Sequence, residues 1–255
     1  MGKIISLLNH KGGVGKTTSA INIGAGLVKL GKKVLLIDLD PQANLTLSLG
    51  IPRQASTIYE ALRGESELTP VTVKEGLDVV ASVLDLSGAE MELINEAGRE
   101  FILKELFDPI RTTYDYIIID CPPSLGLLTL NALTSSDYVL IPLQTEFLAM
   151  QGLAKIKQVI SKVKIRLNKN LQIGGVIATM YDNRKVLNRD VVETIKKYFG
   201  KMVFETKIRD NVALAEAPAQ RKDIFEYSPS SSGAKDYLAL CKEIIERSEK
   251  ETIGA

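Results

Sequence analysis

The chain has 255 residues, of which 45% are hydrophobic and 25% charged, and it contains two cysteines and one histidine. This composition indicates an ordinary globular protein and excludes a disulfide framework and a histidine-built metal centre. No apolar stretch approaches the roughly 18 residues of a membrane span, and charge and glycine interrupt the first apolar run too early for a signal peptide, so we expect a single cytoplasmic domain over residues 1–255.

The first predicted element is a buried strand, Ile4–Leu8, which leads into a glycine-rich loop and then a helix over Ser19–Leu30. The loop consists of Lys11-Gly12-Gly13-Val14-Gly15-Lys16-Thr17-Thr18. Its glycines allow backbone amides to approach an anion closely, and the helix N-terminus favours negative charge. Lys16 can reach the β- and γ-phosphates, and the Thr17 hydroxyl can bind Mg²⁺. The strand, loop and helix together predict a nucleotide-binding P-loop rather than a simple tight turn.

One position separates this loop from the common P-loop pattern G-x-x-x-x-G-K-[ST]. The residue six places before Lys16 is His10 rather than glycine, and a second lysine, Lys11, follows it. We therefore expect a deviant form of the Walker A loop, in which an additional cation stands at the beginning of the loop.

Two further predicted strands end in carboxylates. The run Val34–Ile37 leads into Asp38-Leu39-Asp40-Pro41, and the run Tyr116–Ile119 leads into Asp120. Ligands of a parallel sheet bind beyond the carboxyl ends of its strands, so these carboxylates can face the phosphate site. An acid after four apolar residues has the form of the motif that supports Mg²⁺ in P-loop enzymes. Asp and Pro also form turns, which is the competing interpretation of the first segment.

The remaining apolar runs alternate with helical patterns. The predicted strands are Leu77–Val80, Tyr138–Ile141, Ile173–Thr179 and a short one at Met202–Phe204. The predicted helices are Ala97–Phe107, Leu148–Leu167, Asn188–Phe199 and one from Ala234 to about Lys250. Several strands are β-branched without polar alternation, as strands buried on both faces are. This order predicts an α/β fold, a mostly parallel twisted sheet with helices on both faces.

The charge is distributed unevenly along the chain. Residues 155–222 hold 16 basic and 6 acidic side chains, whereas residues 1–154 hold 12 and 18. Solvated helix faces explain most single lysine runs, but an asymmetry of this size indicates a basic surface for nucleic acid. Adjacent basic side chains gather between a predicted strand and helix, and we predict DNA contacts at Arg184, Lys185 and Arg189.

Three segments carry a resemblance to a known family. They are the loop at 11–18, Asp38-Leu39-Asp40-Pro41-Gln42 and Ile119-Asp120-Cys121-Pro122-Pro123-Ser124-Leu125-Gly126. Together they resemble the deviant-Walker partition ATPases of the ParA/Soj family, which act in bacterial chromosome and plasmid segregation. The similarity covers nearly the whole chain and implies a MinD/ParA-like P-loop NTPase fold. Because the loop begins at residue 11, we expect a small member without an N-terminal helix-turn-helix domain.

The resemblance implies a role for each motif residue. Lys11 would cross a two-fold interface to the ATP of a partner subunit, so that ATP drives a sandwich homodimer. Asp40 would position the attacking water, and Asp120 would lie at the Mg²⁺ shell. The catalytic residues implied are Lys11, Lys16 and Asp40, and the metal site implied is Thr17, Asp40 and Asp120. The nucleotide-binding residues implied are Lys11, Gly12, Gly13, Val14, Gly15, Lys16, Thr17, Thr18, Met180 and Asn211.

The implied function is ATP-dependent DNA partitioning. The ATP-bound dimer would bind double-stranded DNA of the nucleoid non-specifically, with Arg184 in the place of a DNA-contacting arginine of the family. A ParB/Spo0J-like centromere-binding protein would stimulate the weak ATP hydrolysis and so release the dimer from DNA.

Three alternatives share the loop. A relative that positions other cargo on DNA differs mainly in its partner, which the sequence does not reveal. A MinD-like membrane-associated ATPase is less compatible, because the terminal helix lacks the basic face and aromatic residues of a membrane-surface helix. An electron donor similar to the nitrogenase iron protein needs a bridging cluster, and Cys121 and Cys241 stand in unrelated settings.

Overall fold

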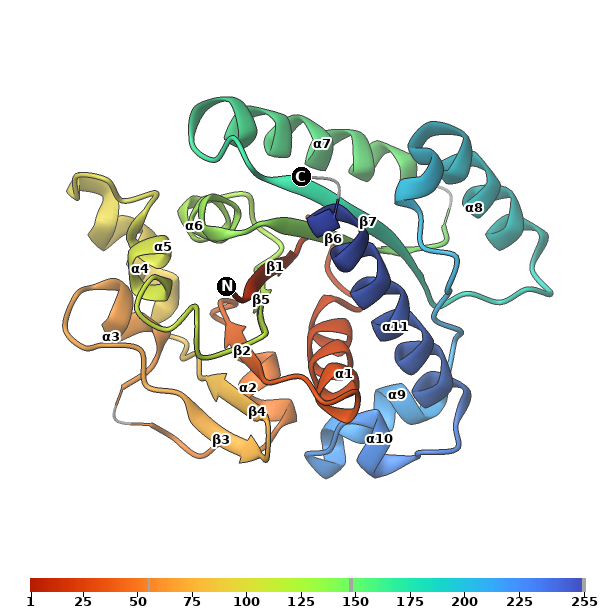
Figure 1. Ribbon diagram of the computed structural model, residues 1–255, viewed down its shortest axis with the longest axis horizontal. Coiled ribbons are helices and arrows are strands. Elements are labelled where there is room, and N and C mark those ends of the chain that lie inside the picture. Colours follow the sequence, from red (N-terminus) through yellow and green to blue (C-terminus); the bar gives the residue numbers. More distant parts are fainter. Residues whose placement is uncertain (55, 147–148, 254–255) are drawn as a thin grey trace.

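A computed structural model describes residues 1–54, 56–146 and 149–253, with side chains at all of these except 149–151 and 250–253. Seven strands form one sheet in the order β3-β4-β2-β5-β1-β6-β7 (Figure 1). They are β1 (Lys3–Leu7), β2 (Val34–Asp38), β3 (Val71–Lys74), β4 (Leu77–Val80), β5 (Tyr116–Asp120), β6 (Tyr138–Gln144) and β7 (Gln172–Thr179). Neighbouring strands are parallel except for the antiparallel edge pair β3 and β4. The predicted α/β fold is confirmed.

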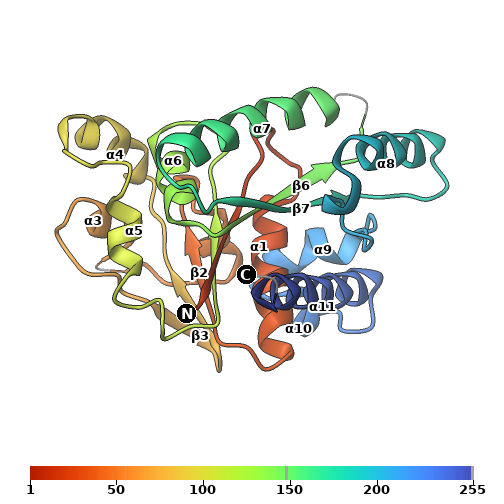
Figure 2. The same ribbon diagram turned by 45° about the horizontal axis from the view of Figure 1, so that its top comes forward.

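Helices cover both faces of this sheet (Figures 1 and 2). One face carries α3 (Ile58–Leu62), α4 (Leu86–Glu92), α5 (Ile102–Phe107), α6 (Leu127–Ser135), α7 (Ala149–Arg166) and α8 (Val186–Phe199). The other carries α1 (Lys16–Lys29), α2 (Asn44–Ser48), α10 (Ile224–Tyr227) and α11 (Ser232–Ile253), with α9 (Val212–Glu216) beside them.

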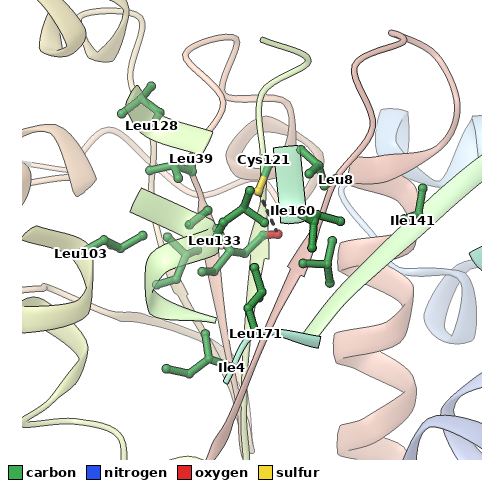
Figure 3. Packing of buried hydrophobic residues seen from close by; sticks show 14 of the residues in the cluster. Ile4, Leu8, Leu39, Leu103, Cys121, Leu128, Leu133, Ile141, Ile160 and Leu171 are labelled. Atoms are coloured by element: carbon green, nitrogen blue, oxygen red, sulfur yellow. Dashed lines mark hydrogen bonds between the residues drawn. The ribbon is translucent and has the colours of Figure 1, made fainter. Parts of the chain in front are cut away.

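The central strands contribute side chains to two separate hydrophobic cores, because successive residues of a strand point to opposite faces of the sheet. Ile4 and Ile117 belong to the core under α3–α8, which Figure 3 shows closely packed around Leu133 and Ile160. Ile5 belongs to the core under α1 and α11. Strands buried on both faces account for the unalternated apolar runs of the sequence.

Two predicted elements are wrong in extent. The expected strand Met202–Phe204 is a 3₁₀ turn, Gly200–Met202, followed by a single bridge from Val203 to Val176. The expected helix Ala97–Phe107 is helical only over Ile102–Phe107, since Gly98 has a φ of 71° that a right-handed helix excludes. The predicted start of another helix, Leu148, lies outside the described residues.

Short or uniformly apolar elements escaped prediction. Helix α6 is buried nearly all round, so its sequence has no amphipathic period to detect. Helices α2, α3, α9 and α10 have only four or five residues each, too few for a helical period to emerge. Within the described residues, no helix is both long and apolar enough to cross a membrane.

Candidate nucleotide-binding site

The glycine-rich loop connects β1 to the N-terminus of α1. Gly13 and Gly15 have φ values of 74° and 86°, which side-chain-bearing residues rarely adopt, and Gly15 directly precedes the first helical turn. Val14 between them is buried, and its carbonyl accepts a hydrogen bond of 2.8 Å from the Thr179 hydroxyl of β7. The loop is therefore held in a shape that allows its glycine amides to surround an anion, whereas the Lys11 amide already donates to Asn9 Oδ1 at 3.0 Å.

The two lysines of the loop have different surroundings. Lys16 is 7% exposed, and its Nζ donates to the Lys11 carbonyl oxygen at 3.4 Å, so its side chain lies back over the loop. The Lys11 ammonium instead pairs with Glu146 at 2.7 Å, and both side chains are about half exposed. Lys16 lies over its own loop, where it can contact a phosphate bound there. Lys11 instead lies beside Glu146 at the surface.

Two carboxylates meet where β2 and β5 end. Asp38 and Asp120 are direct neighbours in the parallel register, and both are completely buried. Asp38 accepts hydrogen bonds from Thr46 Oγ1 at 2.7 Å and from the Thr46 amide at 2.9 Å. Burial raises the pKa of Asp38 to about 6 against the effect of these bonds. Burial also raises the pKa of Asp120 to about 8, and the Asp38 charge adds to the shift.

Asp120 has the properties of a cation-supporting group. Neither of its carboxylate oxygens has a hydrogen bond of ordinary geometry to another described residue, and the Thr17 hydroxyl is only close enough to act as a weak donor. The Thr17 hydroxyl and the Lys16 ammonium lie near enough to lower the pKa of Asp120 against its burial. A buried, unsatisfied carboxylate is costly unless a cation compensates it. No cage of three or more His, Cys, Asp or Glu side chains is present in the described part of the chain, but Mg²⁺ usually needs only one or two carboxylates beside phosphate and water.

Asp40 belongs to a polar network that sequence reasoning did not foresee. Its Oδ1 accepts from the Gln42 amide at 3.0 Å, and its carbonyl oxygen accepts from Ser82 Oγ at 2.8 Å. Ser82 follows β4, and its amide donates to Thr46 Oγ1 at 2.9 Å, which connects this loop to Asp38. These hydrogen bonds fix the segment after β2 to the end of β2 and to the loop after β4. Asp40 also lies close enough for its charge to raise the pKa of Asp120.

These buried acids predict an unusual pH dependence of stability. The pKa values of Asp38 and Asp120 lie above those of the unfolded chain, so the folded protein binds more protons between about pH 4 and 8. The contribution of these two acids to stability is then greatest below the unfolded pKa and falls as pH rises through the folded values. We expect Asp120→Asn to gain stability over the wild type, by on the order of 3 kcal/mol more at pH 8 than at pH 5.

Urea unfolding without nucleotide or Mg²⁺ at the two pH values measures this difference. Asp108→Asn, at an exposed carboxylate, is the matched control and should follow the wild type at both. An Asp120→Asn advantage that is equal at pH 5 and pH 8 would show that Asp120 is ionised in the folded protein throughout.

A pocket of about 140 Å³ lies beyond the end of the phosphate loop. Met180 and Asn211, two of the predicted nucleotide-binding residues, both line it, and Met180 has a φ of 51° that is uncommon outside glycine. The side-chain Oδ1 of Asn211 caps α9 by accepting from the Ala213 backbone amide at 2.8 Å, and its side-chain Nδ2 donates to Ser232 Oγ. The pocket also contains Ile208, Asp210, Leu214 and Ala215, which flank Asn211 in the chain, and Tyr237 of α11. The site prediction named only Asn211 from the segment 208–215, and no local pattern connects Tyr237 to it.

Helix α11 fixes one wall of this pocket through an ion pair. Arg209 donates through Nη2 to Asp236 Oδ1 at 2.6 Å and through its amide to Oδ2 at 3.0 Å. On the other side the Ile208 amide donates to the Ala178 carbonyl at 2.8 Å, so that this segment continues the edge of the sheet. The hydroxyl of Tyr237, at the base of the pocket, lies 3.0 Å from Ser19 Oγ of α1.

The three predicted DNA-binding residues lie together on the exposed surface between β7 and the first turn of α8. The Arg184 side chain is 86% exposed and donates through Nε and Nη2 to Asp182 at 3.0 and 2.9 Å. These bonds lower the pKa of Asp182 to about 2. Arg189 donates to the Asn183 carbonyl at 2.7 Å, and Lys185 immediately precedes α8. Asp182 partly neutralises a surface that the sequence presents as basic.

The parallel sheet, the loop after its central strand β1 and the acids at the ends of β2 and β5 define a P-loop NTPase. A family described as "AAA domain" matches residues 2–173. The sporulation initiation inhibitor protein Soj of Bacillus subtilis is 47% identical over 96% of this chain and 98% of its own length. The chromosome-partitioning ATPase Soj of Treponema pallidum is 46% identical over 97% and 98%. The chain belongs to the ParA/Soj family of chromosome-partitioning ATPases.

Solved structures agree with this assignment. The cobyrinic acid a,c-diamide synthase of Mycobacterium smegmatis, crystallised with ADP and magnesium, is 35% identical and superposes with a TM-score of 0.87 over 98% of this chain and 96% of that one. A plasmid partition protein from Borrelia burgdorferi is 30% identical, with a TM-score of 0.76 over 98% of this chain and 99% of that one.

Proposed function

We propose that this protein is a DNA-partitioning ATPase that hydrolyses ATP to ADP and phosphate. The observation that carries the proposal is the meeting of the Lys16 ammonium, the glycine amides of the loop and the unsatisfied Asp120 carboxylate at one edge of the sheet. Loop amides and Lys16 bind the phosphates, and the pocket at Met180 takes the base. Thr17, Asp40 and Asp120 would hold Mg²⁺, and the ion would supply positive charge that neutralises the phosphates.

The residues of this chain promote hydrolysis by positioning the attacking water and by stabilising charge on the γ-phosphate. Asp40, fixed through its bonds to Gln42 and Ser82, orients a water molecule toward the γ-phosphorus. The water oxygen forms a bond to that phosphorus while the bond from phosphorus to the bridging oxygen of ADP breaks. Both protons of the water leave with the product as dihydrogen phosphate. Lys16 stabilises the charge that accumulates on the transferred group.

The surroundings of Lys11 support an ATP-bound sandwich homodimer. Its ion pair with Glu146 is half exposed, and such pairs contribute only about 0–1 kcal/mol. The polyphosphate of a nucleotide bound to a second subunit carries several negative charges and competes readily with one carboxylate. We infer that Lys11 leaves Glu146 for the partner's nucleotide when two ATP-loaded subunits meet, which makes Lys11 a catalytic residue in trans.

DNA binding follows from the basic surface of the dimer. Arg184, Lys185 and Arg189 contact phosphates of double-stranded DNA without reading sequence, and the protein associates with the nucleoid in the cytoplasm. A ParB-like centromere-binding protein stimulates hydrolysis and so releases the dimer. Family membership and the clustering of the three side chains support this part of the proposal.

The experiment that tests DNA binding uses the pair Arg184 and Asp182. We expect Arg184→Ala to weaken binding of ATP-loaded protein to duplex DNA about fivefold and to reduce the salt slope by about 1, with dimerisation intact. Asp182→Asn should strengthen binding, because it removes the charge that Arg184 now neutralises. Fluorescence anisotropy across a salt series measures both, and Arg53→Ala is the matched control at an exposed arginine. Loss of ATP-dependent dimerisation in Arg184→Ala would instead make this arginine structural.

A further inference from the structure

A groove of about 650 Å³ lies between α3, the 3₁₀ turn Leu93–Asn95 after α4, and α5. These helices lie at one end of the molecule, whereas α8 with the predicted DNA-binding residues lies at the other (Figures 1 and 2). None of the residues assigned to the nucleotide or DNA sites lines the groove. Its chemistry therefore needs a separate explanation.

The floor of the groove is apolar. Leu62 and Leu93 are buried beneath it, and Ile102 and Leu106 of α5 are half buried and pack against the same core. Ile102 and Leu106 are four residues apart, so they form one stripe along the helix. A stripe of this kind receives the apolar face of another element.

The rim of the groove is acidic. Glu65, Glu92, Glu96 and Glu105 line it and are exposed, and Arg63 is the one cation among the lining residues that the structure describes. Arg63 already pairs with Glu65 at 2.9 Å and with Glu92 at 3.2 Å. The surrounding segment 58–108 holds 12 acidic and 4 basic residues. The rim thus keeps a net negative charge after its internal pairing.

We propose that this acidic groove, the one bounded by α3 and α5, binds a cationic amphipathic helix of a partner protein. Leucine-like side chains of that helix lie on Ile102 and Leu106, and its lysines or arginines lie beside Glu96 and Glu105. Negative charge on the rim disfavours nucleic acid and anionic lipid. The proposal goes beyond the ATPase function, since it requires neither nucleotide nor DNA.

The test measures the dissociation constant of a fluorescent 18-residue synthetic helix of leucine and lysine. The peptide is titrated with this protein, without nucleotide, and binding is followed by fluorescence anisotropy. We expect Glu96→Lys/Glu105→Lys to weaken binding at least about tenfold, because two attractive contacts become repulsive. Glu75→Lys/Glu246→Lys, which changes the net charge equally at exposed sites elsewhere, should weaken it less than about twofold. Leu106→Gln leaves the charge of the groove unchanged and should weaken peptide binding only through loss of the apolar contact on its floor.

Several results would overturn the proposal. Equal weakening in the two double variants would mean non-specific attraction to an acidic surface. Equal binding of a leucine–glutamate helix would exclude the assigned charge complementarity, and no binding of the lysine helix would exclude the site itself. If Glu96→Lys/Glu105→Lys abolishes self-association of the protein in sedimentation without peptide, then a second copy of this chain occupies the groove instead.

Discussion

We expect Lys16→Ala to weaken nucleotide binding at least about 100-fold, which corresponds to a loss of about 2.7 kcal/mol of binding free energy. The Lys16 ammonium is nearly buried over the loop, where charge-assisted bonds to phosphate are strong. Lys11 does not replace it, because the proposed role of Lys11 is to reach the nucleotide of the partner subunit. Titration with a fluorescent ATP analogue in the presence of Mg²⁺ measures the loss.

Lys29→Ala is the matched control, since it removes an exposed lysine from the last turn of the same helix. It should bind the analogue as the wild type does. If Lys16→Ala keeps its affinity within threefold, the phosphates do not lie over this loop and the proposed ATP site is wrong.

The second large effect concerns Asp40. We expect Asp40→Asn and Asp40→Ala both to bind ATP while turnover falls at least about 100-fold, because the group that orients the attacking water is lost. The ATP-loaded dimer should then persist on DNA. Phosphate release under DNA stimulation, together with size-exclusion chromatography in ATP, measures the two properties.

The two substitutions separate chemistry from loop geometry. Asparagine keeps an oxygen for the Gln42 amide, which now donates to Asp40 Oδ1, whereas alanine leaves that amide without its acceptor. A role in water positioning predicts equal loss of turnover in both variants. If Asp40→Asn retains most activity and only Asp40→Ala loses it, then Asp40 acts by shaping the segment after β2. Asp108→Ala, at an exposed acid, should leave turnover unchanged.

The elements that bear the site were predictable because their signals are local. The Gly-Gly-Val-Gly-Lys sequence predicted a glycine loop followed by a helix, and Gly13 and Gly15 have φ values of 74° and 86°. The helix begins at Lys16, three residues before the predicted start at Ser19. Apolar runs that end in Asp38 and Asp120 indicate parallel strands buried on both faces, and the register places these acids side by side.

Other features depend on residues that are distant in the sequence. Thr46 and Ser82 join Asp38 to Asp40 across a loop and a strand, and neither residue belongs to a recognisable motif. One wall of the pocket at Met180 depends on the ion pair between Arg209 and Asp236, which lies 27 positions later in the chain. Helix α6 escaped prediction because complete burial removes the polar face on which helical periodicity rests.

The sequence by itself determined the fold class, the phosphate loop, the acids beside it and the family. Each of these rests on residues that are adjacent in the chain: the glycines of the loop, the apolar runs of the strands and the short motifs that follow them. Tertiary structure alone decided the protonation and partners of those residues. Burial raises the pKa of Asp120, Glu146 engages Lys11, and Asp182 engages Arg184. These states depend on desolvation and on charges brought close by folding, which no local pattern encodes.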